Sequence, residues 1–122
     1  MIGWGNFLIP MNVEEIREYC LLKEDVEECF PFDAVTLVFK VQGKMFLLCG
    51  LDAIPISFNA KCNPEKVEEL REQYSSILPG YHMNKKHWNT IVCDGSIPKK
   101  LLLELIDHSY NLVHKKSLKK KK

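Results

Sequence analysis

The sequence predicts a single α+β domain in which helices pack against an antiparallel sheet, in the order α-β-β-β-α-β-α. The chain has 122 residues, which is long enough for one hydrophobic core and short for two ordinary domains. Three segments show apolar residues at helical spacing, and the segments between them are short runs of β-branched and aromatic residues bounded by Gly, Pro or Asn. Neither a repeat nor a linker divides the chain, so we expect one compact unit.

The first predicted helix covers residues 12–23. Asn12 is placed to act as its N-cap, and Glu15 three residues later completes a capping box. Ile16 and Cys20 fall on the inner face, while glutamates take the outer face. The acidic segment EDVEECFPF that follows is interrupted by a proline, and we expect it to be a loop.

Three strands are predicted next. Residues 34–41 and 44–51 are apolar runs around the turn Gln42-Gly43, which is typical of a β-hairpin. Residues 56–61 alternate between apolar and polar side chains, so this third strand has one face in the core and one in water. The wet face carries Ser57, Asn59 and Lys61.

The rest of the chain predicts helix, strand and helix. Asn63 followed by Pro64 opens the second helix, and the sequence SSILPG ends it in a turn. Residues 88–93 form a strand, and the last helix begins near Pro98 with Ser96 or Ile97 as its cap. Its apolar stripe predicts lengthwise packing on the sheet; the stripe consists of Leu102, Leu105, Ile106, Ser109, Leu112 and Val113.

The ends of the chain differ from its body. We expect residues 1–10 to be an N-terminal extension, with a natural start at Met11, and residues 11–114 to be the domain. Residues 115–122 form a lysine-rich tail that we expect to be disordered, because like charges repel and little apolar surface is present. The tail holds six of the 17 basic residues, which leaves 11 basic against 16 acidic residues and a net charge of −5 for the body.

Composition also bears on the cellular compartment. The five cysteines form no CxxC pair, and most lie in apolar surroundings, which indicates buried free thiols in a reducing cytoplasm. No apolar run approaches the roughly 20 residues that span a bilayer, so we expect no membrane contact. We expect a cytoplasmic protein and favour a monomer.

The stretch GYHMNKKHWNT, residues 80–90, is the strongest candidate for a binding site because it interleaves aromatic side chains with cations. Lysines contact phosphates, asparagines read base edges and planar rings stack on bases. Two further lysines open the last helix and are expected to lie nearby. The candidate nucleic-acid-binding residues are Tyr81, His82, Asn84, Lys85, Lys86, His87, Trp88, Lys99 and Lys100. The alternative is that Tyr81 and Trp88 are core anchors of a turn.

Other chemistries fit the sequence less well. Lys85 and Lys86 would repel a divalent cation between His82 and His87, so we expect no metal there. Phosphate-binding glycine motifs and a nucleophile elbow are absent from the sequence. His108 lies beside Asp107 on a helix, and a solvated face explains this pair better than a general base. We therefore expect neither an enzyme nor a cofactor.

The run GYHMNKKHWNTIVCDGSIP followed by LLLELIDHSYNLV resembles the MmcQ/YjbR family of small bacterial proteins. The hairpin and the segment NPEKVEELREQY fit as well, so the resemblance covers roughly residues 11–114. It implies a CyaY-like, or double-wing, fold, whose members are commonly labelled DNA-binding by analogy of the paired wings.

Three functional hypotheses follow. The first is a non-enzymatic DNA-binding protein that contacts phosphate through Lys85, Lys86 and His87, helped by Lys99, Lys100 and the tail. The second is a protein-interaction or small-ligand module, in which Tyr81, His82 and Trp88 line a pocket; a deep apolar cleft beside residues 80–90 would favour it, and a flat positive surface would favour DNA. The third is a frataxin-like metal binder that uses the acidic ridge between Glu14 and Glu28.

Overall fold

The computed structural model of the chain describes residues 11–115. The predicted N-terminal extension and the tail from residue 116 onward lie outside the described residues. The α+β class is confirmed: three helices accompany a six-stranded antiparallel sheet in this part of the chain. The helices are α2 (Val13–Leu21), α3 (Pro64–Gln73) and α4 (Lys99–Val113).

The strands are β1 (Val26–Cys29), β2 (Thr36–Val41), β3 (Lys44–Gly50), β4 (Ser57–Lys61), β5 (Ile77–Pro79) and β6 (Trp88–Val92). Their order in the sheet is β1-β2-β3-β4-β6-β5, and every neighbouring pair is antiparallel. β1 and β5 are the two edges of the sheet.

Two of these strands correct the sequence prediction. Residues 26–29, expected to be part of a loop, pair with β2 as β1, and residues 77–79, expected in a turn, pair with β6 as β5. An edge strand needs one partner and can stay polar on its exposed side, so neither segment shows the apolar alternation of a central strand. The cap prediction for α4 was also wrong, because its N-cap is Pro98 and no side chain caps it.

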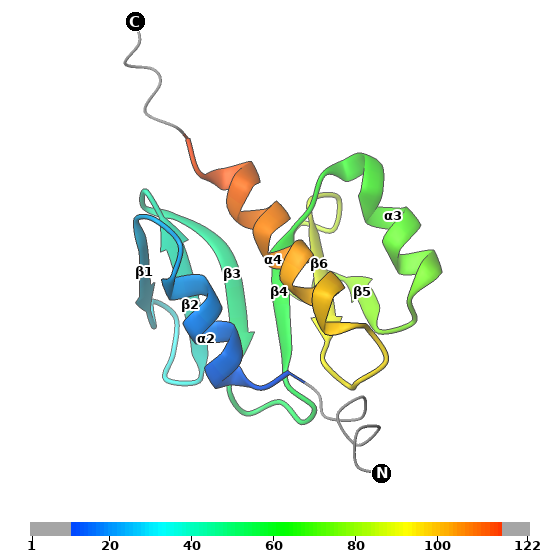
Figure 1. Cartoon of the computed structure of the whole chain (residues 1–122), viewed down its shortest axis with the longest axis horizontal. Coiled ribbons are helices and arrows are strands. Elements are labelled where there is room, and N and C mark those ends of the chain that lie inside the picture. The colour runs from blue at the N-terminus through cyan, green and yellow to red at the C-terminus, as the bar shows by residue number, and fades with distance from the viewer. Residues whose placement is uncertain (1–10, 116–122) are drawn as a thin grey trace, which may run out of the picture.

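The helices α2 and α4 lie across one face of the sheet, and α3 lies beside β5 (Figure 1). The main core fills the space between this face and the helices. Ile16 and Cys20 enter it from α2, as predicted, and the capping box of Asn12 and Glu15 is present. α4 buries the predicted stripe except for Leu112, which is exposed, and it buries Tyr110 in addition.

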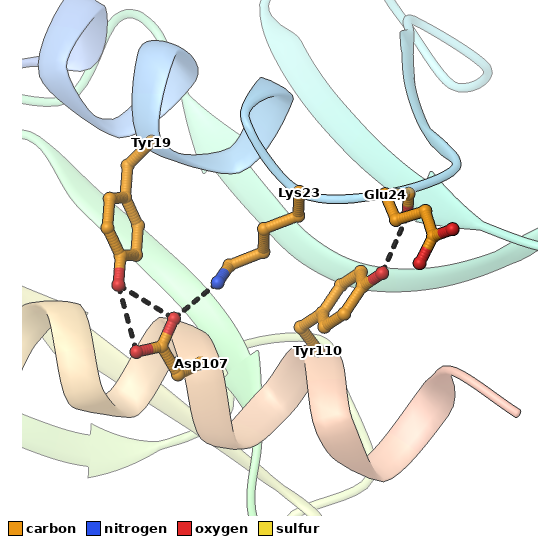
Figure 2. Close-up of polar contacts among 5 residues, drawn as sticks. All are labelled: Tyr19, Lys23, Glu24, Asp107 and Tyr110. Carbon is orange, nitrogen blue, oxygen red and sulfur yellow. Dashed lines mark hydrogen bonds and ion pairs between the residues drawn. The ribbon is translucent and has the colours of Figure 1, made fainter. Parts of the chain in front are cut away.

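A polar clamp joins the C-terminal end of α2 to α4 (Figure 2). The Tyr19 hydroxyl donates to both carboxylate oxygens of Asp107 at 2.8 and 2.9 Å, and the Lys23 ammonium pairs with the same carboxylate. Tyr110 donates to the backbone carbonyl of Glu24 at 2.6 Å. Burial, together with the hydrogen bond to Asp107, raises the pKa of Tyr19 to about 12, so its hydroxyl remains a donor at neutral pH. Asp107 therefore serves helix packing.

The cysteines behave as small core residues. All five are free thiols, and four of them are buried, while Cys29 is partly exposed. Burial raises the pKa of Cys20, Cys49 and Cys93 to about 12. These three thiols are therefore protonated and poorly nucleophilic at neutral pH.

Among the described residues, no helix combines the length and the apolar character needed to cross a membrane.

Candidate functional site

Within residues 11–115, the helices leave one face of the sheet uncovered, and this is called the open face (Figure 1). Residues paired across antiparallel strands point to the same face, so the register defines which side chains meet there. One row crosses the whole sheet at its centre: Cys29, Val38, Leu48, Asn59, Thr90 and Leu78. A second row next to it contains Thr36, Gly50, Ser57 and Val92. The open face is thus apolar toward β1 and polar over β4 and β6.

One part of the open face is closed by a small second core. Val38, Leu48 and Trp88 are buried in it, and Cys29, Met45 and Met83 pack against them. Trp88 is 8% exposed. Its burial agrees with the alternative prediction for Trp88, whereas Tyr81, which the same alternative placed in the core, is exposed.

Beside this second core the open face is hollowed into a groove of about 930 Å³. Its apolar lining includes Met45, Leu48, Leu78 and Met83, with the exposed rings of Phe32 and Tyr81 also contributing. Its polar lining includes Thr36, Ser57, Asn59, Thr90, His82 and Asn84. Asp52 is the one carboxylate in the lining that the structure describes, and this described lining contains no lysine or arginine. The groove is therefore mostly apolar, with neutral hydrogen-bonding groups on its floor.

One wall of the groove is the loop that joins β5 to β6, residues 80–87. Gly80 is buried where this loop leaves β5, and a Cβ atom there would lie 2.8 Å from the Trp88 Cβ. Only glycine allows this close approach of two backbones. The Gly80 amide donates to the Trp88 carbonyl at 3.0 Å, which closes the loop at its base.

Two cationic side chains stabilise the loop by donating hydrogen bonds to backbone carbonyls. The Lys85 ammonium donates to the carbonyls of Gly80 at 2.9 Å and Met83 at 3.3 Å. Arg71 reaches over from α3, donating from Nε to the Asn89 side-chain oxygen at 2.7 Å and from Nη2 to the carbonyls of Lys85 and Trp88. Asn89 is 2% exposed, so Arg71 satisfies an otherwise buried acceptor. Arg71 and Lys85 therefore fix the shape of the groove wall.

The tip of the loop is conformationally unusual. His82 has φ = 59°, in the left-handed region that non-glycine residues seldom occupy. Its ring lies 4.0 Å from the Tyr81 ring, centroid to centroid. Such backbone conformations persist where surrounding contacts enforce them, and they concentrate at ligand-binding positions.

A hydrogen-bonded chain links this wall to the floor of the groove. The Tyr81 amide donates to the Thr90 hydroxyl oxygen at 2.9 Å, and the Thr90 hydroxyl in turn donates to the side-chain oxygen of Asn59. These hydrogen bonds therefore hold wall and floor in a fixed relation.

The structure divides the nine predicted site residues into separate groups. Tyr81, His82 and Asn84 line the groove, whereas the other six are absent from its lining: Lys85, Lys86, His87, Trp88, Lys99 and Lys100.

The predicted lysines do not gather in one place. Lys86 and Lys100 are exposed, and Lys99 pairs with Glu15 at 2.6 Å. Figure 1 shows the loop before β6 at one end of that strand and the start of α4 beyond its other end. Lys85 and Lys86 therefore belong to the loop at one end of β6, and Lys99 and Lys100 belong to the start of α4 beyond its other end (Figure 1).

The groove also depends on residues that the sequence prediction did not select. Phe32, Asn59 and Thr90 line it, and Arg71 supports it from behind. The sequence did indicate that the Asn59 side chain is accessible, since Asn59 lies on the polar face of a strand whose other face is apolar. The sequence did not indicate a role for Arg71, because its position in a charged helix is typical of a solvated side chain.

The other polar residues considered from the sequence are engaged in packing. His108 accepts a hydrogen bond at Nε2 from the Asn63 amide at 3.1 Å, and burial lowers the pKa of this imidazole. In the acidic ridge, Glu28 pairs with Arg17 at 2.6 Å. Within residues 11–115 no group of three or more His, Cys, Asp or Glu side chains is arranged to hold a metal ion.

The sequence model of a family described as YjbR matches residues 21–112. The chain belongs to the YjbR family. The resemblance to the MmcQ/YjbR proteins is thereby confirmed, and the bacterial origin of the relatives agrees with it.

Two relatives and one solved structure define how this YjbR-family chain is related to known proteins. It is 45% identical over 89 residues to the uncharacterized protein YbdF of Escherichia coli O157:H7, covering 72% of each chain. It is 33% identical over 100 residues to the uncharacterized protein YjbR of Escherichia coli K12, covering 82% of this chain and 85% of that one. The crystal structure of Deinococcus radiodurans protein DR2400 superposes with a TM-score of 0.85 at 41% identity, over 93% and 90% of the two chains.

Proposed function

We propose that this YjbR-family protein is a non-enzymatic binding module that holds a small organic molecule in the groove of the open face. The observation that carries the proposal is a mostly apolar groove of about 930 Å³ directly beside residues 80–90. Ligand sites for small molecules commonly have volumes of about 300–1,000 Å³, apolar walls and a few placed polar groups.

The charge of the groove argues for a small molecule over a polyanion. Nucleic-acid binding depends on Lys and Arg side chains that neutralise phosphates, and the groove lining formed by residues 11–115 contains neither. Asp52 adds a negative charge, which would repel a phosphate.

The way the loop is held also favours ligand binding. Lys85 and Arg71 direct their donors to backbone carbonyls inside the loop, which keeps the wall in one conformation. A preformed site avoids the entropic cost of ordering a loop when the ligand binds. These two cations therefore contribute to the shape of the site.

A role in binding without catalysis fits the groups that line the groove. The titratable side chains of the described lining are Asp52, His82 and Tyr81, and they come from two different loops. Asp52 lies between β3 and β4, and the other two lie between β5 and β6. No hydrogen bond joins these three side chains to one another, whereas a catalytic site of that kind pairs a nucleophile with a base.

A groove-filling variant tests the proposal. Gly50 lines the groove, and a Cβ atom at this position meets only Asp52 Oδ1, at an ordinary contact distance of 3.9 Å. Gly50→Phe therefore puts a ring into the groove without a backbone clash. Asn111→Phe is the matched control, because Asn111 is exposed on α4, which packs on the other face of the sheet.

The measurement is a two-dimensional NMR titration of the labelled full-length chain with a library of neutral aromatic fragments. We expect fragments to shift the resonances of groove residues in the wild type and in Asn111→Phe, and to lose this effect in Gly50→Phe. Absence of any groove-specific shift in the wild type, or equal binding by Gly50→Phe, would overturn the proposal.

DNA binding is the second candidate, and the exposure of Lys86 and Lys100 favours it. A duplex would have to span both ends of β6 to contact the two lysines together. The test is fluorescence anisotropy with duplex DNA across a range of salt, on a chain ending at Lys115 and on the same chain with Lys86→Glu and Lys100→Glu. The DNA hypothesis expects a log-log salt slope of about −0.9 per phosphate contact, reduced in the double variant. Equal affinity of the two chains for DNA would show that neither lysine contributes to the interface.

A further inference from the structure

We infer that the ligand is uncharged and presents a carbonyl-type acceptor to the side-chain amide of Asn59. This inference rests on the proposed function, since it names the chemical class that the same groove selects. The argument uses the orientation of one amide, its surroundings and the charge of the groove.

The orientation of the Asn59 amide follows from the hydroxyl beside it. The Thr90 hydroxyl oxygen already accepts the Tyr81 amide at 2.9 Å, and its own hydrogen is donated to Asn59 Oδ1. The oxygen of the Asn59 amide therefore lies toward Thr90, which leaves the Nδ2 group, with its two N–H donors, on the other side.

The Nδ2 group has no hydrogen-bond partner within residues 11–115, although Asn59 is partly buried and lines the groove. In the row across the open face, Asn59 lies between Thr90 and the apolar Leu48. A donor with an apolar neighbour gains more from an acceptor than a fully solvated donor does. The donor is therefore suited to an oxygen or ring nitrogen carried by a ligand.

The charge of the groove selects against an ionised acceptor. A carboxylate or phosphate is held most strongly by a lysine or arginine, and the described lining contains neither while it does contain the carboxylate of Asp52. A ketone, amide or ring carbonyl accepts from Asn59 without needing a cation. The apolar side chains beside it, Leu78 and Met83, accommodate the hydrocarbon part of such a molecule.

The test uses indanone and indane, two neutral bicyclic compounds of the same shape that differ in one carbonyl group. Their affinities are measured by NMR titration with the wild type, Asn59→Asp and the control Asn111→Asp. The aspartate at position 59 retains an oxygen that accepts from Thr90 but lacks the N–H donors. We expect the ratio of indanone to indane affinity to fall about ten-fold in Asn59→Asp and to stay unchanged in the control.

A second measurement uses only the wild type, so its result does not depend on whether a variant folds. In the wild type, indanone should shift the side-chain amide resonances of Asn59, and indane should shift those of the apolar lining but leave the amide near its free position. If both compounds bind in the groove with the same ratio in Asn59→Asp and the same Asn59 shifts, the inference is wrong and the proposed function stands. If neither compound nor any other neutral aromatic fragment binds the wild-type groove, the proposed function fails and the inference fails with it.

Discussion

The two faces of the sheet differ in what their polar groups do. On the helix-covered face, the buried Ser109 hydroxyl donates to the Phe46 carbonyl and accepts the Lys61 amide at 2.8 Å, so its polar groups are bonded within the fold. On the open face, Asn59 uses its oxygen and keeps its N–H donors uncommitted within the described chain. The covered face therefore supplies stability, and the open face keeps hydrogen-bonding capacity for another molecule.

The largest expected effect tests the covered face. Phe46→Ala should lower the free energy of unfolding by about 3–5 kcal/mol, because Phe46 is fully buried and its ring packs edge-on against Tyr110 at 5.4 Å. Phe32→Ala, on the groove side, should change the free energy of unfolding by less than about 0.5 kcal/mol, because Phe32 is 62% exposed. Chemical denaturation of both variants measures the difference, and similar losses would contradict the division between the faces.

The next effect concerns the support of the groove wall. Arg71→Met keeps the length of the side chain but removes its hydrogen bonds and leaves the buried Asn89 oxygen unpaired. We expect a loss of about 1.5–3 kcal/mol, as for other hydrogen bonds to charged groups. Hydrogen exchange should become faster in residues 80–87 than in the core strands. Arg17→Met is the control, since Arg17 forms a more exposed pair with Glu28; equal exchange in both variants would contradict the supporting role.

A somewhat smaller loss is expected for Ser109→Ala. This change leaves the Phe46 carbonyl and the Lys61 amide without their partner in the core, which should cost about 1–3 kcal/mol. Thr90→Val is the matched change on the open face, where solvent can replace the lost bonds, so its effect should be smaller. Thermal and urea unfolding compare the two, and a larger loss for Thr90→Val would reverse the assignment of the faces.

The smallest effect is a pH dependence at the turn between β6 and α4. Hydrogen bonds from Ser76 and Ser96 lower the pKa of Asp94 to about 2 from an ordinary value of 3.8. A lowered folded-state pKa means that this stabilisation is present above pH 3.8 and is lost as the pH falls toward 2. Asp94→Asn should therefore differ from the wild type near neutral pH, by less than about 1 kcal/mol because the group is exposed, and the difference should shrink below pH 3. Unfolding curves across this range measure it, and a gap independent of pH would exclude the charge as its cause.

The sequence predicted the covered face much better than the open face. The spacing of apolar residues in a helix identifies its buried side directly, so Ile16 and Cys20 could be assigned to the core from the sequence alone. β1 and β5 could not, because edge strands carry too little apolar alternation to differ from loops. Strand pairing also creates the groove. Phe32, from the loop between β1 and β2, and Thr90, on β6, line it together although they are far apart in the sequence, and no local sequence pattern predicts this.

The candidate site was predicted in part. Tyr81, His82 and Asn84 were selected as part of an aromatic and basic segment, and they do line the groove. The segment alone could not show that the Lys85 ammonium turns inward to backbone carbonyls while Lys86 stays exposed, because adjacent lysines look alike in a sequence.

The two edge strands have a consequence for how the molecule meets other copies of itself. β1 carries the exposed Glu27, and β5 is three residues long and ends at Pro79, which has no amide hydrogen. Charge repulsion on one side and a missing donor on the other both disfavour annealing of an extra strand, which is the first step of fibril growth. The edges of the sheet therefore disfavour edge-to-edge association at high protein concentration, although the protein also has an apolar groove.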